Sequence, residues 1–216
     1  MIYEFPREDE PIRQGDIFAH IPRTEISLGS LALVRDTGTE EAQWSDIVNE
    51  PDQLTVILPV RPVYAIVASQ DCDNVRSPDI TLCEIKPFAD VEGKAKDASK
   101  TKAWVSIITQ QARTNLKWFY LPPDDNVGFT GKMAVEFAVT IRVPRLGLEA
   151  LRKFRRGRLN PVADEHFRER LAEFFRRYPY DEWYALNETE LEYYRSQYSE
   201  AEPYPWQKPD QSTESQ

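Results

Sequence analysis

Short runs of β-branched and aliphatic residues, separated by turn-forming residues, fill much of the first two thirds of the chain. Such runs are typical of β-strands when Pro, Gly, Asp or Ser bound them. The strands expected from this pattern are IRQGDIFAHIP at 12–22, TEISLGSLALVRD at 24–36, LTVILPV at 54–60, VYAIVAS at 63–69, ITLCEI at 80–85, NLKWFYLPPDDNVGF at 115–129, where Pro122 and Pro123 close the strand, and MAVEFAVTIRV at 133–143. The stretch at 36–53 is polar and acidic, and it predicts a loop with one helical turn.

Hydrophobic residues recur at helical spacing at one place inside this β-rich region and repeatedly after Pro144. Asn160 is a suitable N-cap for one C-terminal helix, because its side chain can accept a hydrogen bond from the first turn while Pro161 takes the first helical position. The pattern predicts an inserted helix around 103–111 and later helices at 146–156, 162–178 and 188–198.

The order of these elements predicts an α+β fold, in which a small β-barrel with one inserted helix carries a helical C-terminal extension. We expect a flexible N-terminal arm over residues 1–11, because Pro6 and Pro11 bracket an acidic cluster that cannot bury itself. The barrel domain is expected over 12–145 and the helical extension over 146–199. A disordered, Pro-rich tail is expected over 200–216.

Composition and charge narrow the function classes. The chain has 216 residues, of which 41% are hydrophobic, enough to bury one sizeable core. Its net charge of −9 disfavours a protein that coats nucleic acid, because such binding depends on clustered Lys and Arg. Residues 140–177 differ, with eleven Lys and Arg against five Asp and Glu. The charged N-terminus and the lack of a long apolar run predict a cytoplasmic protein without membrane association.

Both cysteines lie in RPVYAIVASQDCDNVRSPDITLCEI at 61–85. Asp71 and Asp73 flank Cys72, and adjacent carboxylates disfavour the thiolate that a nucleophilic cysteine needs. Together with Cys83 and a histidine these residues could hold a metal, although their spacing matches no standard structural zinc pattern. We favour a site without metal or cofactor at the end of a strand. There Asp71 and Asp73 would hydrogen-bond the turn backbone, and Cys72 would fill a small apolar space.

A basic stretch, RKFRRGR at 152–158, falls in a predicted helix. Its arginines could bind phosphate. Alternatively, the hydrophobic residues at helical spacing form a core stripe, and the arginines form the solvated face of the same helices, paired with glutamates one turn away. The candidate binding residues in this stretch are Arg152, Arg155, Arg156 and Arg158.

Three blocks, RQGDIF at 13–18, VRPVYAIVASQDCDN at 60–74 and RSPDITLCEI at 76–85, resemble in order and type the barrel of the MazF/PemK toxins. The shared features are an R-x-G-D-[IV] first strand, an R-P-V strand, and a short turn that ends in S-P before a β-branched strand. The resemblance covers residues 13–88 and implies an SH3-like/PemK-like β-barrel. The insertion at 23–59 is longer than such toxins carry there, and the helices after Pro144 have no counterpart.

In that family the barrel cleaves single-stranded RNA without a metal, and the resemblance implies roles for an arginine and a threonine. Such cleavage can use the 2′-OH of the RNA, so the protein supplies a cation for the phosphorane charge and a proton-transfer group. Arg61 matches the arginine, whereas Lys86 stands at the threonine position. The alternative for Arg61 is a structural pairing with Asp16 or Glu84. The nearby carboxylates of Asp71, Asp73, Asp79 and Glu84 would repel the phosphates of an RNA strand, which disfavours an RNA-binding groove here.

We therefore expect a non-catalytic protein-interaction or regulatory module that docks a protein partner. Asp71, Cys72, Asp73 and the four arginines are its candidate binding residues. The alternative is a metal-independent endoribonuclease for single-stranded RNA that uses Arg61 and Lys86. By the resemblance, either function belongs in a bacterial toxin–antitoxin or phage-defence system. The sequence leaves the partner and the oligomeric state open.

Overall fold

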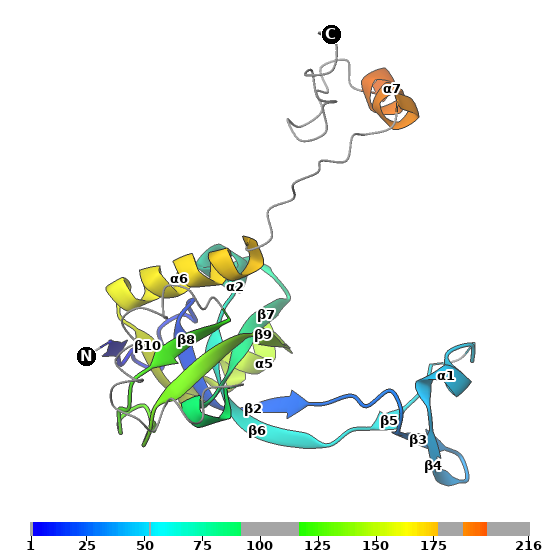
Figure 1. Ribbon diagram of the computed structural model, residues 1–216, viewed down its shortest axis with the longest axis horizontal. Coiled ribbons are helices and arrows are strands. Elements are labelled where there is room, and N and C mark those ends of the chain that lie inside the picture. Colours follow the sequence, from blue (N-terminus) through cyan, green and yellow to red (C-terminus); the bar gives the residue numbers. More distant parts are fainter. Residues whose placement is uncertain (1, 52, 92–116, 177–187, 198–216) are drawn as a thin grey trace, which may run out of the picture. The chain divides into compact units, whose positions relative to one another are not determined.

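The computed structural model describes residues 2–51, 53–91, 117–176 and 188–197 (Figure 1). The chain divides into two compact units, Met1–Phe175 and Arg176–Gln216. The second unit contains helix α7, Glu188–Gln197, which agrees with the helix predicted at 188–198. The helix predicted around 103–111 and the tail at 200–216 lie outside the described residues. None of the helices in the described ranges is long and apolar enough to cross a membrane.

The main sheet contains seven antiparallel strands in the order β1-β10-β2-β6-β7-β9-β8. Their bounds are β1 Tyr3–Glu4, β2 Asp16–Thr24, β6 Val60–Val67, β7 Asp79–Pro87, β8 Trp118–Leu121, β9 Met133–Pro144 and β10 Arg155–Leu159. The expectation of a mixed α+β fold is confirmed. No pairing among the described strands joins the edge strands β1 and β8, so barrel closure stays a prediction.

The helices of the first unit are short, apart from α6. Asn160 caps α6 as predicted, because its Oδ1 accepts a hydrogen bond from the Ala163 N–H over 2.9 Å, and Pro161 is the first helical residue. The helices and 3-10 turns are α1 Trp44–Ile47, α2 Asp71–Arg76, η1 Phe88–Asp90, α5 Arg145–Ala150, η3 Arg152–Phe154 and α6 Pro161–Arg176.

The central strands of the main sheet are buried on both faces. Ile17 belongs to the core on one face, where Phe167 of α6 packs against Phe137 with ring centroids 5.7 Å apart. The next residue, Phe18, belongs to the core on the other face, together with Leu148 of α5. Double-sided burial explains why these strands read as continuous hydrophobic runs, since a strand with one solvated face would alternate.

The residues between β2 and β6, numbers 25–59, form a second sheet and are called the insert below. Its three antiparallel strands, β3 Leu31–Arg35, β4 Gly38–Ala42 and β5 Val56–Ile57, have the order β4-β3-β5. Ile47 of α1 packs with Leu31 and Leu33 on one face, so the insert has a small core of its own. The stretch predicted as a loop with one helical turn therefore contains α1 and also strand β4.

The basic stretch at 152–158 is not a helix, which differs from the prediction. A single 3-10 turn, Arg152–Phe154, leads into strand β10, which pairs with both β1 and β2. Because β10 and α6 contribute to the main sheet and its core, the first compact unit extends to Phe175, past the boundary expected at 145.

The N-terminal segment also differs from the predicted flexible arm. Tyr3 is buried, its strand pairs with β10 at Leu159, and its hydroxyl donates a hydrogen bond to the Pro122 carbonyl over 2.8 Å. The burial of one aromatic side chain and the new ladder hydrogen bonds hold this end of the chain in place, even though the residues that follow are acidic.

Candidate functional site

Arg61 lies near the start of β6, and two carboxylates compensate its charge. Its Nη2 donates to Glu84 Oε1 over 2.7 Å and to Glu25 Oε1 over 3.4 Å. Arg23, which stands opposite Arg61 on β2, donates to the other Glu84 oxygen over 3.2 Å. Hydrogen bonding to Glu84 raises the pKa of Arg61 above its ordinary value. Of the two structural pairings considered from the sequence, the structure contains the one with Glu84.

Lys86 on β7 is held in the same way, since its Nζ forms an ion pair with Glu136 Oε2 on β9. Both side chains are three quarters buried. Within the described part of the chain, no hydrogen bond or ion pair links Lys86 to Arg61. A ribonuclease of the expected type needs a cation that can neutralise the charge on phosphorus. In this geometry, carboxylates of the protein already bind both cations and neutralise their charge, in the place that a phosphate would take.

Asp71, Cys72 and Asp73 form the first turn of helix α2 and not the end of a strand. The Gln14 N–H donates to Asp71 Oδ1 over 2.7 Å, so this carboxylate binds backbone as expected, but the backbone of a distant segment. Cys72 and Asp73 are exposed. The expectation that Cys72 fills an apolar space is therefore wrong, because the helix directs Asp71 to the Gln14 backbone and leaves the next two side chains exposed.

The two thiols lie in different environments. Cys83 is buried in the core of the main sheet, and burial raises the pKa of its thiol to about 12. The Sγ of Cys72 lies 3.8 Å from oxygens of Gln70 and Asp73 at the surface. Over the described ranges, no group of three or more His, Cys, Asp or Glu residues is arranged to hold a metal ion.

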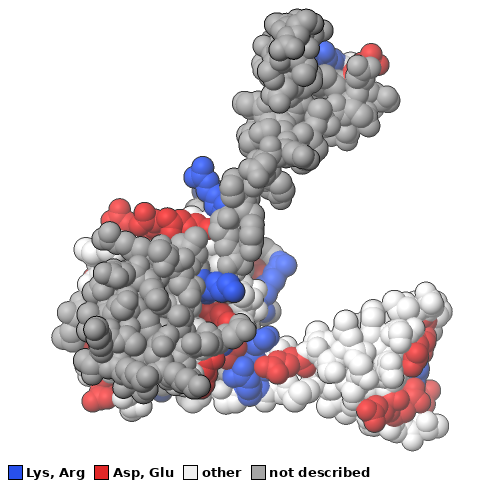
Figure 2. All heavy atoms as spheres, in the orientation of Figure 1, with Lys and Arg blue, Asp and Glu red and all other residues white. Residues whose placement is uncertain are grey.

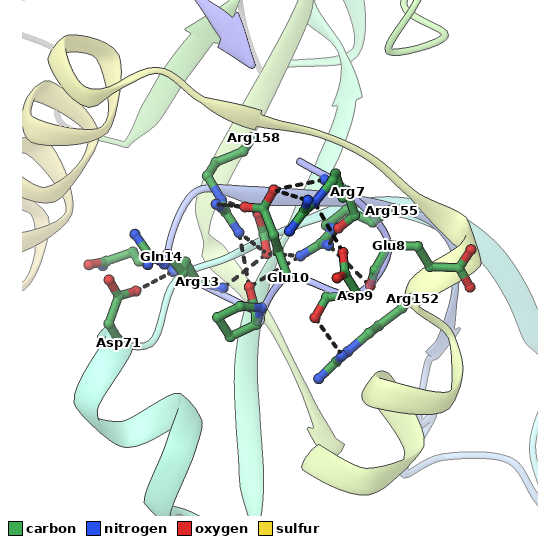
Figure 3. A network of polar contacts seen from close by, with 12 residues as sticks. Arg7, Glu8, Asp9, Glu10, Arg13, Gln14, Asp71, Arg152, Arg155 and Arg158 are labelled. Carbon is green, nitrogen blue, oxygen red and sulfur yellow. Dashed lines mark hydrogen bonds and ion pairs between the residues drawn. The ribbon is translucent and has the colours of Figure 1, made fainter. Parts of the chain in front are cut away.

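A buried charged cluster surrounds Asp16, which has no exposed surface. Figure 3 shows two arginines of this cluster, Arg155 and Arg158, beside residues of the N-terminal segment. Arg158 Nε donates to Asp16 Oδ1 over 2.5 Å, and Arg155 Nη1 donates to Oδ2 over 3.1 Å. Arg158 also donates to the Pro11 carbonyl over 3.0 Å, and Arg155 donates to the Arg7 carbonyl. A buried carboxylate requires such partners. Arg155 and Arg158 therefore fasten the N-terminal segment to the sheet, so neither is available to bind phosphate.

Arg152 and Arg156 have different surroundings from these two arginines. Arg152 Nη1 donates to the Asp9 carbonyl over 3.4 Å, whereas Arg156 is exposed on β10. The structure thus separates the four arginines into a buried pair, one side chain bound to the N-terminal backbone, and one side chain in solvent. They do not form one cationic surface.

An open pocket of about 740 Å³ lies where α6 passes the start of α2. At its edge, Arg168 lies 2.7 Å from Asp164 Oδ2 and 3.8 Å from Asp71 Oδ2. Burial raises the pKa of Asp164 to about 6, and its Oδ1 is buried without a hydrogen-bond partner. The guanidinium and the carboxylates compensate one another, so the geometry favours no particular ligand. The lining residues are Gln14, Ala68, Gln70, Asp71, Cys72, Arg168, Glu169, Leu171, Ala172 and Phe175.

The insert carries an unusual concentration of exposed apolar side chains. Nearly half of the large hydrophobic residues that are exposed in the described ranges belong to it, namely Ile26, Leu28, Val34, Trp44, Val48 and Ile57. The insert also contains seven Asp and Glu residues against a single basic residue, Arg35, which is held by Glu40 and Glu50. Figure 2 shows a broad uncharged surface here, with acidic side chains gathered around the β3–β4 hairpin. Surfaces of this kind mark interfaces.

The sequence patterns did not single out the apolar residues of the insert or the Asp164–Arg168 pair as functional. The pair could have been found from its i, i+4 spacing. The exposure of Val34 and Ile57 could not, because their runs, LALV and TVIL, look like those of strands that are buried on both faces.

No family model matches the chain, and no curated protein matches it. The resemblance of residues 13–88 to the MazF/PemK toxins stays a hypothesis.

Proposed function

We propose that the protein is a non-catalytic protein-interaction or regulatory module, in which the insert is the docking surface and the main sheet is the scaffold. The proposal includes a PemK-like barrel for the main sheet. By the resemblance of residues 13–88, it also includes a role in a bacterial toxin–antitoxin or phage-defence system in the cytoplasm.

The exposed apolar side chains of the insert carry this proposal. Leu28 and Trp44, for example, are 61% and 43% exposed. Apolar surface costs about 25 cal/mol for each Å² left in water, and a partner that covers it recovers that free energy. The insert already has its own core of Leu31, Leu33 and Ile47, so the exposed residues are not needed to hold it together. They remain available for an interface.

The ribonuclease alternative has less support. The observation in its favour is that Arg61 is 52% exposed and so reaches solvent at the start of β6. Against it, Glu84 and Glu25 bind the guanidinium, and Glu136 binds Lys86. A phosphate would have to displace these carboxylates. The fold already holds them beside the cations, so an RNA phosphate binds only by breaking these ion pairs.

Two matched triple variants test the interaction module. In the insert variant, the exposed residues Val34, Trp44 and Ile57 are replaced by Ser. In the control variant, three residues outside the insert that are even more exposed, Val75, Leu146 and Val162, are replaced by Ser.

Tagged full-length chains are purified from the native cell, and circular dichroism verifies that each variant is folded. We expect the wild type and the control variant to retain a stoichiometric protein partner that the insert variant loses. Recovery of the wild type without a partner, or equal retention by both variants, would contradict the proposed function.

A further inference from the structure

We infer that the partner binds the open face of the three-stranded sheet in the insert, and that the partner is a protein whose binding surface has an apolar centre and basic side chains around it. This inference rests on the proposed function and specifies both the face and the partner.

The register of the three strands defines the open face. Ala32 stands opposite Glu41 of β4 and opposite Ile57 of β5, and Val34 stands opposite Thr39. Residues directly opposite each other in an antiparallel sheet point to the same side, as do residues two apart along a strand. These five side chains therefore share one face, with the apolar ones on β3 and β5 and the polar ones on β4.

The other face of this sheet is already covered. Leu31 and Leu33 alternate with Ala32 and Val34 along β3, and they are buried beneath Ile47 of α1. Val34 is 41% exposed, whereas Leu33 has no exposed surface. A sheet with one packed face is stable, so the open face has no structural need for apolar residues. Val34 and Ile57 are consistent with a face that another molecule covers.

The charge of the insert specifies the partner's chemistry. Glu41 is exposed beside Ala32 on the open face, and its Oε1 accepts a hydrogen bond from Ser30 Oγ over 2.7 Å. Arg35, the one cation of the insert, is bound by Glu40 and Glu50. Complementary potential therefore requires Lys or Arg side chains on the partner, around an apolar centre that contacts Val34 and Ile57.

The same charges argue against a second copy of this chain as the occupant. A symmetric dimer through the open face would place two inserts against each other, each with seven carboxylates and one arginine. Like charges that face one another across an interface oppose association. A protein with a basic surface meets no such repulsion.

Site-specific photo-cross-linking in the native cell tests the face. A photo-reactive amino acid replaces Val34 on the open face, Trp44 on α1, or Leu146 on α5 as the control position outside the insert. We expect Val34 to give an adduct with a partner protein, through a peptide in which Lys and Arg exceed Asp and Glu, and Leu146 to give none.

The outcomes separate this inference from the proposed function. Adducts from Trp44 but not from Val34 would overturn the open face and leave the interaction module standing. An acidic partner peptide, or an adduct with a second copy of the chain, would overturn the partner's chemistry. No adduct from either insert position would overturn both proposals.

Once cross-linking has identified the partner, the purified partner is used to measure how charge on the insert affects its affinity. We expect Glu41→Lys to weaken binding by about tenfold at low salt, and Glu165→Lys, an exposed position on α6, to change it by less than about twofold. The difference between the two variants should shrink as salt screens the charges. Equal affinities of the two variants at low salt would contradict a basic partner surface on this face.

Discussion

Arg158 Nε lies 2.5 Å from Asp16 Oδ1, and this buried contact joins β10 to β2 across 142 positions of the chain. The same guanidinium donates to the Pro11 carbonyl, so one side chain connects three segments. Residues three apart point to opposite faces of a regular strand, but the pairing of β10 with β2 shifts register between Arg155 and Gly157, so Arg155 and Arg158 both reach Asp16.

Removal of this guanidinium should destabilise the fold strongly. Arg158→Met leaves Asp16 buried with one of its two arginines, and we expect the free energy of unfolding to fall by about 3 kcal/mol. Arg156→Met, two residues away and exposed, should change it by less than about 0.5 kcal/mol. Urea unfolding followed by tryptophan fluorescence measures both values. An equally small loss of unfolding free energy in both variants would mean that the Arg158–Asp16 contact contributes little to stability.

Asp164 should make stability depend on pH in the weakly acidic range. Burial raises its pKa from the ordinary 3.8 to about 6, in surroundings that include Arg168, Asp71, Arg158 and Asp16. The folded state therefore favours the protonated carboxyl. Its contribution to stability is complete below the unfolded pKa, and it is lost as the pH rises through about 6.

The variant Asp164→Asn isolates this contribution, because an amide stays neutral at every pH. Relative to the wild type, we expect the variant's free energy of unfolding to rise by about 1–2 kcal/mol between about pH 4 and pH 7, after an allowance for partial solvent screening. Urea unfolding at several pH values gives the difference. Parallel pH profiles of the two proteins would show that Asp164 titrates normally.

Local signals predicted much of this fold. The strands near 12–22, 63–69, 80–85 and 133–143 follow from β-branched runs between turns, and the start of α6 follows from Asn160 and Pro161. Each of these depends on residues close together in sequence. A propensity or a cap acts at that range, so a single sequence is enough to find it.

What the sequence did not predict depends on distant contacts. Strand β10 pairs with β2 and is held by the contacts of Arg155 and Arg158 with Asp16, and strand β1 pairs only with β10 among the described strands. Helix α2 has six residues, too few for a periodic hydrophobic pattern, and its Asp71 is fixed by the Gln14 backbone. The open face of the insert could not be predicted from the sequence, because a β-branched run does not show how many faces of its sheet are covered.

The two cysteines should differ sharply in reactivity. Cys72 is exposed, whereas Cys83 is buried with a thiol pKa raised to about 12. Because the thiolate is the reactive form, we expect iodoacetamide to modify Cys72 in the folded protein and Cys83 only after unfolding in urea. Intact mass and peptide mapping identify the modified residue. Rapid modification of Cys83 under native conditions would mean that the main sheet opens locally.

Arg61 separates the interaction module from the ribonuclease alternative. Because Glu84 and Glu25 compensate its charge, we expect wild type, Arg61→Ala and Arg142→Ala all to leave single-stranded RNA intact, while an active toxin ribonuclease added as a positive control degrades it. Arg142 is a suitable control, since it also forms an ion pair on the main sheet, with Asp79 over 2.6 Å. Arg142→Ala should cost no more than about 1 kcal/mol of stability, because its ion pair with Asp79 is accessible to solvent. Arg61→Ala should cost more, because it leaves the buried Glu84 with Arg23 alone, so circular dichroism verifies that this variant is folded. Cleavage by the wild type and by Arg142→Ala, but not by Arg61→Ala, would instead assign transition-state stabilisation to Arg61. Glu84 would then be a residue that the RNA phosphate displaces, and Glu84→Gln should increase the rate of cleavage.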